Sequence, residues 1–268
     1  MNARDILLAR KLGPAAPVSL SAKMFAKATG GGGGGPVSPV KDGLIAEWMF
    51  LDNLTDTSGN GNDFVNHVQN ISYGSGVGGS ITKSAIFNQS FAQANNGVLP
   101  SDSPWTISVW LKMTGANVPQ EILGTALIGT DGGNVAKGVQ FLSLTQARYY
   151  QVRLWNGNID PRFLSKANGF TLNTWEHHII IFTNEVSTNG LRSYKNKGLM
   201  EYASVPSSHT HIDGTQYNFF VGGAGAYSGF NYDPTKEPYY GEMAALRIFN
   251  RVLTNEEIAL LYAEGHNE

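Results

Sequence analysis

Residues 105–113 read Trp-Thr-Ile-Ser-Val-Trp-Leu-Lys-Met, and this stretch decides the fold class. Its apolar positions alternate with the others: Ile107, Val109, Leu111 and Met113 against Thr106, Ser108, Trp110 and Lys112. Successive side chains of a β-strand point to opposite faces, whereas a helix repeats every 3.6 residues. The period of two therefore predicts a β-strand with two usable faces.

Short segments of the same kind lie on both sides of this stretch. Further strands are predicted at residues 44–50, 85–87, 139–144, 149–155, 175–183, 191–195, 219–222 and 244–249. Asn-Gly pairs at 156–157 and 189–190 and a Lys-Gly pair at 197–198 are turn signals between several of them. Many short strands predict an all-β fold, with two antiparallel sheets packed as a jelly-roll sandwich.

One short C-terminal helix completes the predicted domain. Thr254 and Glu257 have the spacing of a capping box, in which each side chain bonds the other residue's backbone N–H. Leu253 and Ile258 have the spacing of a hydrophobic staple, and Gly265 follows the end. We expect the apolar side of this helix to pack on the sandwich.

Composition excludes several classes of protein. The 268 residues include 32 glycines, as many tight turns require, and no cysteine, so neither a disulfide nor a thiolate ligand is available. Only 15% of residues are charged, against about 25% in an average soluble protein. No stretch of about 18 apolar residues predicts a membrane span, and no dense basic run with aromatics predicts nucleic-acid binding.

The N-terminus differs from the rest of the chain. We divide the sequence into an arm (residues 1–29), a Gly/Pro linker (30–42) and a domain (43–268). The arm predicts two short helical pieces, too short to be stable alone, so they need a surface to dock on. The apolar residues expected to anchor the arm to a partner, or to copies of itself, are Ile6, Leu7, Leu8, Leu12, Met24 and Phe25. A disordered tail is the alternative interpretation.

Charge separates the same two parts. Residues 1–41 carry six basic groups and one acidic group, and the remainder carries 13 basic and 20 acidic groups, giving +5 and −7. A basic arm on an acidic body suggests that the two parts face different partners. The apolar run of residues 6–9 is followed by Arg10 and Lys11 and is too short for a signal peptide, so none is predicted.

Several motifs in order resemble the laminin-G-like, concanavalin-A-like jelly-roll family. They are Gly43-Leu-Ile-Ala-Glu-Trp48, Asp56-Thr-Ser-Gly-Asn-Gly-Asn62, residues 105–112, Trp175-Glu-His-His-Ile-Ile180, the hairpin 194–198, Val221-Gly-Gly223, and residues 241–253 followed by Glu256-Glu-Ile258. The resemblance covers about residues 43–263. It implies a lectin-like sandwich that binds a glycan or a cell-surface ligand.

The arm is similar to the N-termini of bacteriophage virion proteins of the tail-fibre, head-fibre or decoration type. The shared features are a short helical start, a polyglycine run at residues 30–35 and no signal peptide ahead of a lectin-like domain. The resemblance implies a protein released by host lysis and displayed on the virion surface, with other virion proteins as partners of residues 1–29. Such appendages are commonly homo-oligomers, although no heptad repeat here enforces one.

A calcium site is the most specific chemical hypothesis. Asp56, Ser58, Asn60 and Asn62 place oxygen ligands at alternate positions around Gly61, as in the first half of a calcium loop. The resemblance implies one structural Ca²⁺ near this loop, and we expect Glu242 as the distal ligand. The alternative is a glycine-rich turn whose Asp and Asn side chains accept local backbone N–H groups.

Two aromatic clusters are candidates for glycan binding, since aromatic faces pack on sugar C–H groups and planar amides reach ring hydroxyls. The expected ligand-binding residues are Tyr150, Arg153, Trp155 and Asn156 in one cluster and Tyr227, Phe230, Asn231, Tyr232 and Tyr239 in the other. The second cluster falls in a predicted long loop, residues 223–241, where binding residues concentrate. Packing in the core or between subunits is the alternative for these aromatics.

The sequence offers little support for catalysis or zinc. Adjacent His177 and His178 on a strand point to opposite faces, and the 209/211 pair has no identifiable third ligand. No strand carries the alternating carboxylates of a glycan hydrolase, and no nucleophile elbow or phosphate loop occurs. We interpret the chain as a non-enzymatic virion adhesion protein that displays a glycan-binding domain. The alternatives are a purely structural decoration or fibre protein and a bacterial carbohydrate-binding module.

Overall fold

The computed structural model describes residues 38–68, 71–100, 103–115, 119–125, 127–128, 137–144, 149–156, 162–165, 169–185, 190–204, 218–223, 225–226 and 237–266. The arm (residues 1–29) and its six predicted anchoring residues lie outside these ranges, as does most of the linker. Helices and strands in the described residues all belong to the predicted domain.

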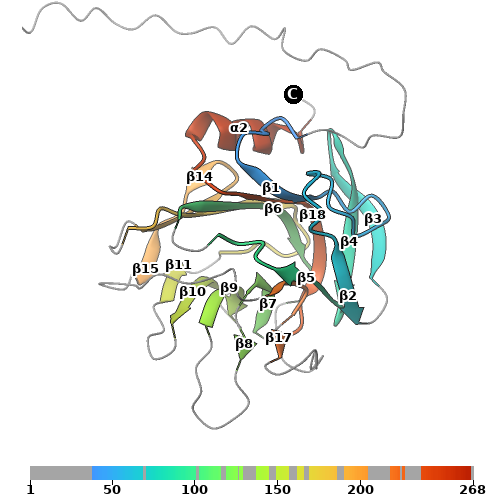
Figure 1. Cartoon of the computed structure of the whole chain (residues 1–268), viewed down its shortest axis with the longest axis horizontal. Helices are drawn as coiled ribbons and strands as arrows, with labels where there is room; N and C mark the ends of the chain where they lie inside the picture. The colour runs from blue at the N-terminus through green and yellow to red at the C-terminus, as the bar shows by residue number, and fades with distance from the viewer. Residues whose placement is uncertain are drawn as a thin grey trace, which may run out of the picture. The chain divides into compact units, whose positions relative to one another are not determined.

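Two eight-stranded sheets form the layers of a sandwich (Figure 1). The first has the order β14 (Gly198–Leu199), β13 (Leu191–Lys195), β12 (Glu176–Phe182), β6 (Trp105–Met113), β18 (Tyr240–Phe249), β4 (Ile81–Asn88) and β3 (Ser72–Gly78), with β1 (Leu44–Trp48) also paired to β18. The second has the order β15 (Tyr202–Ser204), β11 (Arg162–Ser165), β10 (Tyr149–Asn156), β9 (Lys137–Leu144), β7 (Gln120–Gly124), β16 (Asn218–Val221), β5 (Phe91–Asn96) and β2 (Phe64–Val68).

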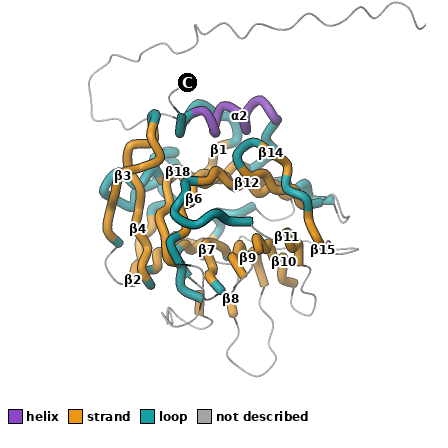
Figure 2. Tube along the Cα trace, turned by 180° about the vertical axis from the view of Figure 1, so that it is seen from behind, coloured by secondary structure: helices purple, strands orange, loops and turns teal. Residues whose placement is uncertain are grey.

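A small parallel pair joins β8 (Leu127–Ile128) to β17 (Gly225–Ala226), whereas the pairings of both large sheets are antiparallel, as in β12 with β6 and β10 with β9. The single described helix, α2 (Asn255–Ala263), lies on the side of the first sheet that faces away from the second (Figure 2). The predicted all-β jelly-roll sandwich with one short C-terminal helix is confirmed.

The hydrophobic core fills the space between the two sheets. Its centre is an aromatic stack in which the Trp48 ring lies 4.4 Å from Phe64 and 5.7 Å from Phe219, centroid to centroid. These residues come from β1, β2 and β16, so the stack joins the first sheet to the second. Fully burying aromatic rings in this way is the largest favourable contribution a core residue makes.

Strand β6 is buried on both faces, whereas its sequence pattern indicates burial of only the apolar face. The odd-numbered apolar residues face the core as predicted, but Thr106, Ser108 and Trp110 are buried as well. Trp110 packs on Tyr262 of α2, with ring centroids 5.5 Å apart. The helix therefore covers the outer face of the first sheet.

The start of α2 follows the predicted capping box. The Glu257 backbone N–H donates to the Thr254 hydroxyl at 3.3 Å, and the Thr254 backbone N–H donates to the Glu257 carboxylate at 2.9 Å. Arg251 adds two hydrogen bonds to the same carboxylate. These contacts satisfy donors that a helix start otherwise leaves unpaired.

An ion-paired network lies beneath α2. The fully buried Arg247 donates to the Glu47 carboxylate at 2.7 Å and to both Glu264 oxygens at 2.6 and 3.0 Å. Glu47 comes from β1, Arg247 from β18, and Glu264 from the end of α2. The network ties both ends of the domain to the first sheet.

Candidate ligand-binding cleft

The loop that follows β1 is organised around the carboxylate of Asp56. Its Oδ1 accepts the backbone N–H groups of Glu47 at 2.9 Å and Ser58 at 2.8 Å. Its Oδ2 accepts the Ser58 hydroxyl and the Asn62 backbone N–H, both at 2.9 Å. Four donors thus surround one buried carboxylate and fix the path of residues 56–62.

Two glycines let the loop follow this path. Gly59 and Gly61 have φ angles of +91° and +76°, which side chains with a Cβ rarely adopt. An added Cβ would meet nothing within 4 Å at either position, so backbone conformation and not space requires glycine.

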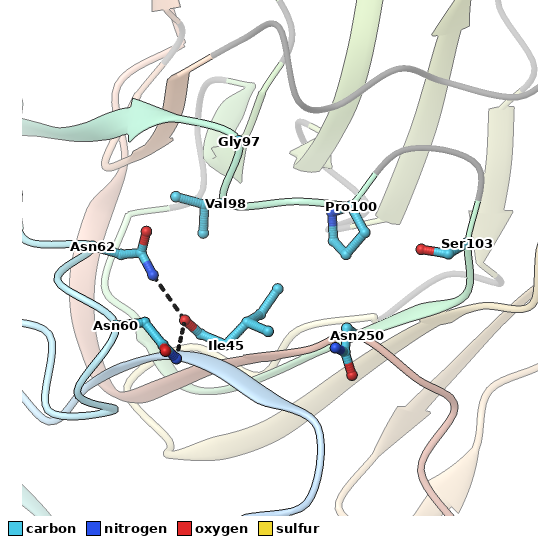
Figure 3. A pocket seen from close by; sticks show the side chains of 8 residues that line it. All are labelled: Ile45, Asn60, Asn62, Gly97, Val98, Pro100, Ser103 and Asn250. Atoms are coloured by element: carbon cyan, nitrogen blue, oxygen red, sulfur yellow. Dashed lines mark hydrogen bonds between the residues drawn. The ribbon is translucent and has the colours of Figure 1, made fainter.

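The loop forms one wall of a cleft of about 580 Å³ (Figure 3). Four segments far apart in the sequence line it: Ile45 in β1, Asn60 and Asn62 in the loop, Gly97, Val98, Pro100 and Ser103 between β5 and β6, and Asn250 after β18. The Asn62 and Asn60 amides both donate to the Ile45 carbonyl, at 2.8 and 3.1 Å. The Trp48 indole N–H holds the Asn62 carbonyl at 2.9 Å from the core side.

The cleft has the chemistry of a site for a neutral polar ligand. Its described lining combines three planar amides and a hydroxyl with the apolar Val98 and Pro100, and none of these described residues is charged. Amides both donate and accept hydrogen bonds, as ring hydroxyls require, and apolar residues pack on C–H groups. None of the described residues that line the cleft carries a carboxylate.

The structure brings together four of the five predicted calcium ligands. Asp56, Ser58, Asn60 and Asn62 lie in one loop, but their hydrogen bonds are those of the alternative interpretation, a turn whose side chains accept local N–H groups. Among the residues that the structure describes, no three His, Cys, Asp or Glu side chains are grouped to hold a metal ion. Calcium at this loop stays a prediction, and an ion there would have to displace donors from Asp56.

Glu242 is the predicted ligand that the structure places elsewhere. Its carboxylate accepts hydrogen bonds from the Ser84 hydroxyl at 2.8 Å and from Lys112 at 2.9 Å. In strand β18, Glu242 pairs with Ile86 and Lys112. The residue of β18 that pairs with Glu47, close to the loop in sequence, is Arg247. Glu242 as the distal ligand was wrong, because the long strand separates it from the loop.

Two predicted glycan contacts were also wrong. Tyr150 is fully buried in the core and donates to the Ser193 hydroxyl at 2.8 Å. Tyr239 is fully buried as well and donates to the Glu242 carbonyl at 3.0 Å, and burial raises the pKa of its hydroxyl. Both rings point inward between the sheets, where no ligand reaches them from solvent.

Of the other predicted glycan contacts, the structure describes the side chain of one, Arg153. Arg153 is partly exposed and donates to the Gln151 side chain at 2.7 Å. Trp155 and Asn156 lie in β10, but their side chains are outside the described part of the structure. Tyr227, Phe230, Asn231 and Tyr232 fall wholly outside the described residues.

Of the eight residues that line the cleft, sequence reasoning singled out only Asn60 and Asn62 and missed the other six. Val98, Pro100, Ser103 and Asn250 carry no motif, because their contribution depends on two connections that meet only in the folded sandwich. The available signal was the pair Asn60 and Asn62, which had been read as metal ligands.

Fold and cleft together define a lectin-like β-sandwich. Residues 87–259 match the concanavalin A-like lectin/glucanases superfamily, and the chain belongs to this family. A search of curated proteins found no match. Among the described residues no helix is long and apolar enough to cross a membrane.

Solved structures share the fold at low sequence identity. Domain 4 of AbnA, an extracellular arabinanase from Geobacillus stearothermophilus, in complex with arabinotriose, has a TM-score of 0.58 and 18% identity, covering 82% of this chain and 98% of that one. The binding domain of Paraclostridial Mosquitocidal Protein 1 has a TM-score of 0.59 and 17% identity, covering 85% and 53%. The binding domain of botulinum neurotoxin DC in complex with SialylT has a TM-score of 0.53 and 14% identity, covering 85% and 52%.

Proposed function

We propose that residues 43–268 form a non-catalytic carbohydrate-binding domain whose ligand occupies the cleft beside the Asp56 loop. The observation that carries the proposal is the described lining of amides, one hydroxyl and an apolar wall, in which no described residue is charged. Structural neighbours solved with arabinotriose and with SialylT support the same class of ligand. The proposal includes display on a virion, with the arm (residues 1–29) as anchor and a host-surface glycan as ligand.

Removing amides from the cleft should weaken glycan binding. A hydrogen bond between neutral groups contributes about 0.5–1.5 kcal/mol, so Asn60→Ala with Asn250→Ala should lower affinity by roughly tenfold or more. The measurement is binding of the full chain to host cell-wall polysaccharide and to a glycan array that includes arabinotriose. Asn53→Ala is the matched control, because this exposed amide lies in the same connection but does not line the cleft.

The same experiment distinguishes the rival roles. Loss of binding in the double variant, with Asn53→Ala unchanged, supports the cleft. Loss with a chelator would add calcium at the Asp56 loop to the mechanism. No binding by folded wild-type protein would contradict the proposal and favour a purely structural decoration protein.

Deleting residues 1–35 tests the anchor. We expect the shortened chain to stay folded, because the described strands and the core all lie between residues 38 and 266. It should bind glycan like the full chain and no longer join the virion. Incorporation comparable to that of the full chain, measured in purified particles, would overturn the anchoring role.

A further inference from the structure

A β-bulge in β1 brings the Ile45 carbonyl to the wall of the cleft. The pairing of β1 with β18 shifts register between Leu44 and Ala46, so Ile45 is the extra residue of the bulge. A bulge leaves its extra residue outside the ladder and re-aims it, and bulges are common beside binding sites. The Ile45 carbonyl oxygen accepts hydrogen bonds from the Asn62 amide at 2.8 Å and from the Asn60 amide at 3.1 Å.

This carbonyl determines which way both amides point. A carbonyl oxygen only accepts hydrogen bonds, so the nitrogen of each amide faces it and the amide oxygen points elsewhere. Asn60 also donates to the Ser58 hydroxyl oxygen at 3.2 Å. Turning the Asn60 amide over would bring its oxygen against that hydroxyl, which donates its own proton to Asp56 at 2.9 Å. The surroundings therefore set the orientation of both amides.

The side-chain oxygens of Asn60 and Asn62 are the groups left for a ligand. Figure 3 shows the oxygen of Asn62 on the side of its amide turned away from the Ile45 carbonyl. Among the described residues, no donor reaches either side-chain oxygen. Asn60 is exposed and Asn62 is half-buried, and both line the cleft. This wall of the cleft thus presents two hydrogen-bond acceptors that come from alternate residues of one loop.

The charges near the cleft do not favour an anionic ligand. Arg251 directly follows Asn250 in the chain, but its guanidinium donates to the Glu257 carboxylate at 2.8 and 2.6 Å. It also lies 2.9 Å from a carboxylate oxygen of Asp42. A cation already paired with two carboxylates attracts a third one weakly. A carboxylate placed against the acceptor wall would therefore have no described cation to balance it.

We propose that the cleft selects its sugar through two neighbouring hydroxyl groups, which donate hydrogen bonds to the side-chain oxygens of Asn60 and Asn62. This inference rests on the proposed carbohydrate-binding function and specifies the groups that the cleft recognises. A hydroxyl can donate to an amide oxygen, whereas an ether oxygen, a fluorine or a carboxylate cannot. The C–H groups of the same ring can pack on Val98 and Pro100, which lie across the cleft (Figure 3).

The test titrates the full chain calorimetrically with arabinotriose, xylotriose, maltotriose and mannotriose, and with trigalacturonate and 3′-sialyllactose as acidic sugars. Each neutral trisaccharide is also used in forms in which the hydroxyl at one ring position is replaced by fluorine in all three sugars. Fluorine is close to a hydroxyl in size but cannot donate. We expect a neutral trisaccharide to bind and to lose roughly two- to tenfold in affinity when either of two neighbouring hydroxyls is replaced.

Variants assign each hydroxyl to its acceptor. In Asn60→Ala, replacement of one of the two hydroxyls should no longer change the affinity, because its partner is already absent, and in Asn62→Ala the same should hold for the other. Asn53→Ala should keep both losses. Thermal unfolding of each variant controls for folding, and Asn60→Ala should unfold close to the wild type because this side chain is exposed.

The outcomes separate this inference from the proposed function. Affinity that is insensitive to fluorine at every neighbouring pair, or losses that persist in full in Asn60→Ala, would overturn the inference while leaving carbohydrate binding intact. Binding of an acidic sugar alone, weakened by Asn60→Ala with Asn250→Ala, would do the same. The absence of any sugar binding, or binding that this double variant does not weaken, would overturn the proposed function and the inference with it.

Discussion

Arg247→Ala is expected to destabilise the protein by about 3–5 kcal/mol, because it leaves two buried carboxylates without their shared cation. Arg247 is fully buried, and its guanidinium contacts Glu47 at 2.7 Å and Glu264 at 2.6 Å. Burial raises the pKa of Glu264 even in the presence of Arg247, and Glu47 adds to that shift. The free energy of unfolding in urea at pH 7 measures the loss.

The pH dependence of this variant has a defined sign. Without Arg247 the folded-state pKa of Glu264 rises further above the unfolded value of about 4.3, so the folded state binds more protons than the unfolded state. The deficit should therefore be largest at neutral pH and shrink as the pH falls toward 4. Adding Glu47→Gln and Glu264→Gln to Arg247→Met removes all three charges and should recover much of the stability. A loss that is independent of pH, or no recovery, would contradict the ion-pair explanation.

Short sequence patterns predicted the fold class because each strand and the helix start can be recognised within a single stretch of a few residues. Alternation in residues 105–113 was sufficient for β6, and Thr254 with Glu257 was sufficient for the start of α2. The network of Glu47, Arg247 and Glu264 could not be predicted, because it joins residues about two hundred positions apart and each looks like an ordinary charge in its own segment.

The candidate sites were predicted less well for the same reason. Residue type marked Tyr150 and Tyr239 as glycan contacts, but both rings are buried: Tyr150 points inward from β10, and Tyr239 packs into the core just before β18. Asn60 and Asn62 were correctly grouped in one loop, while their partner across the cleft, Asn250, comes from the other end of the chain. A short motif defines a turn; the cleft beside it requires the tertiary fold.

Trp48→Ala is the second substitution with a large expected effect. Trp48 is fully buried and stacks on Phe64 and Phe219, so the change leaves a cavity between the sheets. Replacing a buried tryptophan by alanine costs about 3–5 kcal/mol. Trp175→Ala is the matched control, because Trp175 is only partly buried just before β12, and we expect a loss of less than half that size in urea unfolding.

Trp48→Phe connects this core position to the cleft. Phenylalanine keeps an aromatic ring in the stack but cannot donate to the Asn62 carbonyl, which the indole N–H holds at 2.9 Å. The loss in stability should be about 1–2 kcal/mol, from one hydrogen bond and some packing, and the protein should stay folded. Because Asn62 then has a looser backbone, glycan affinity at the cleft should fall several-fold, whereas Trp175→Ala should leave it unchanged. Unaltered affinity in folded Trp48→Phe would show that the cleft does not depend on this hydrogen bond, and the Asp56 carboxylate alone would then account for the conformation of the loop.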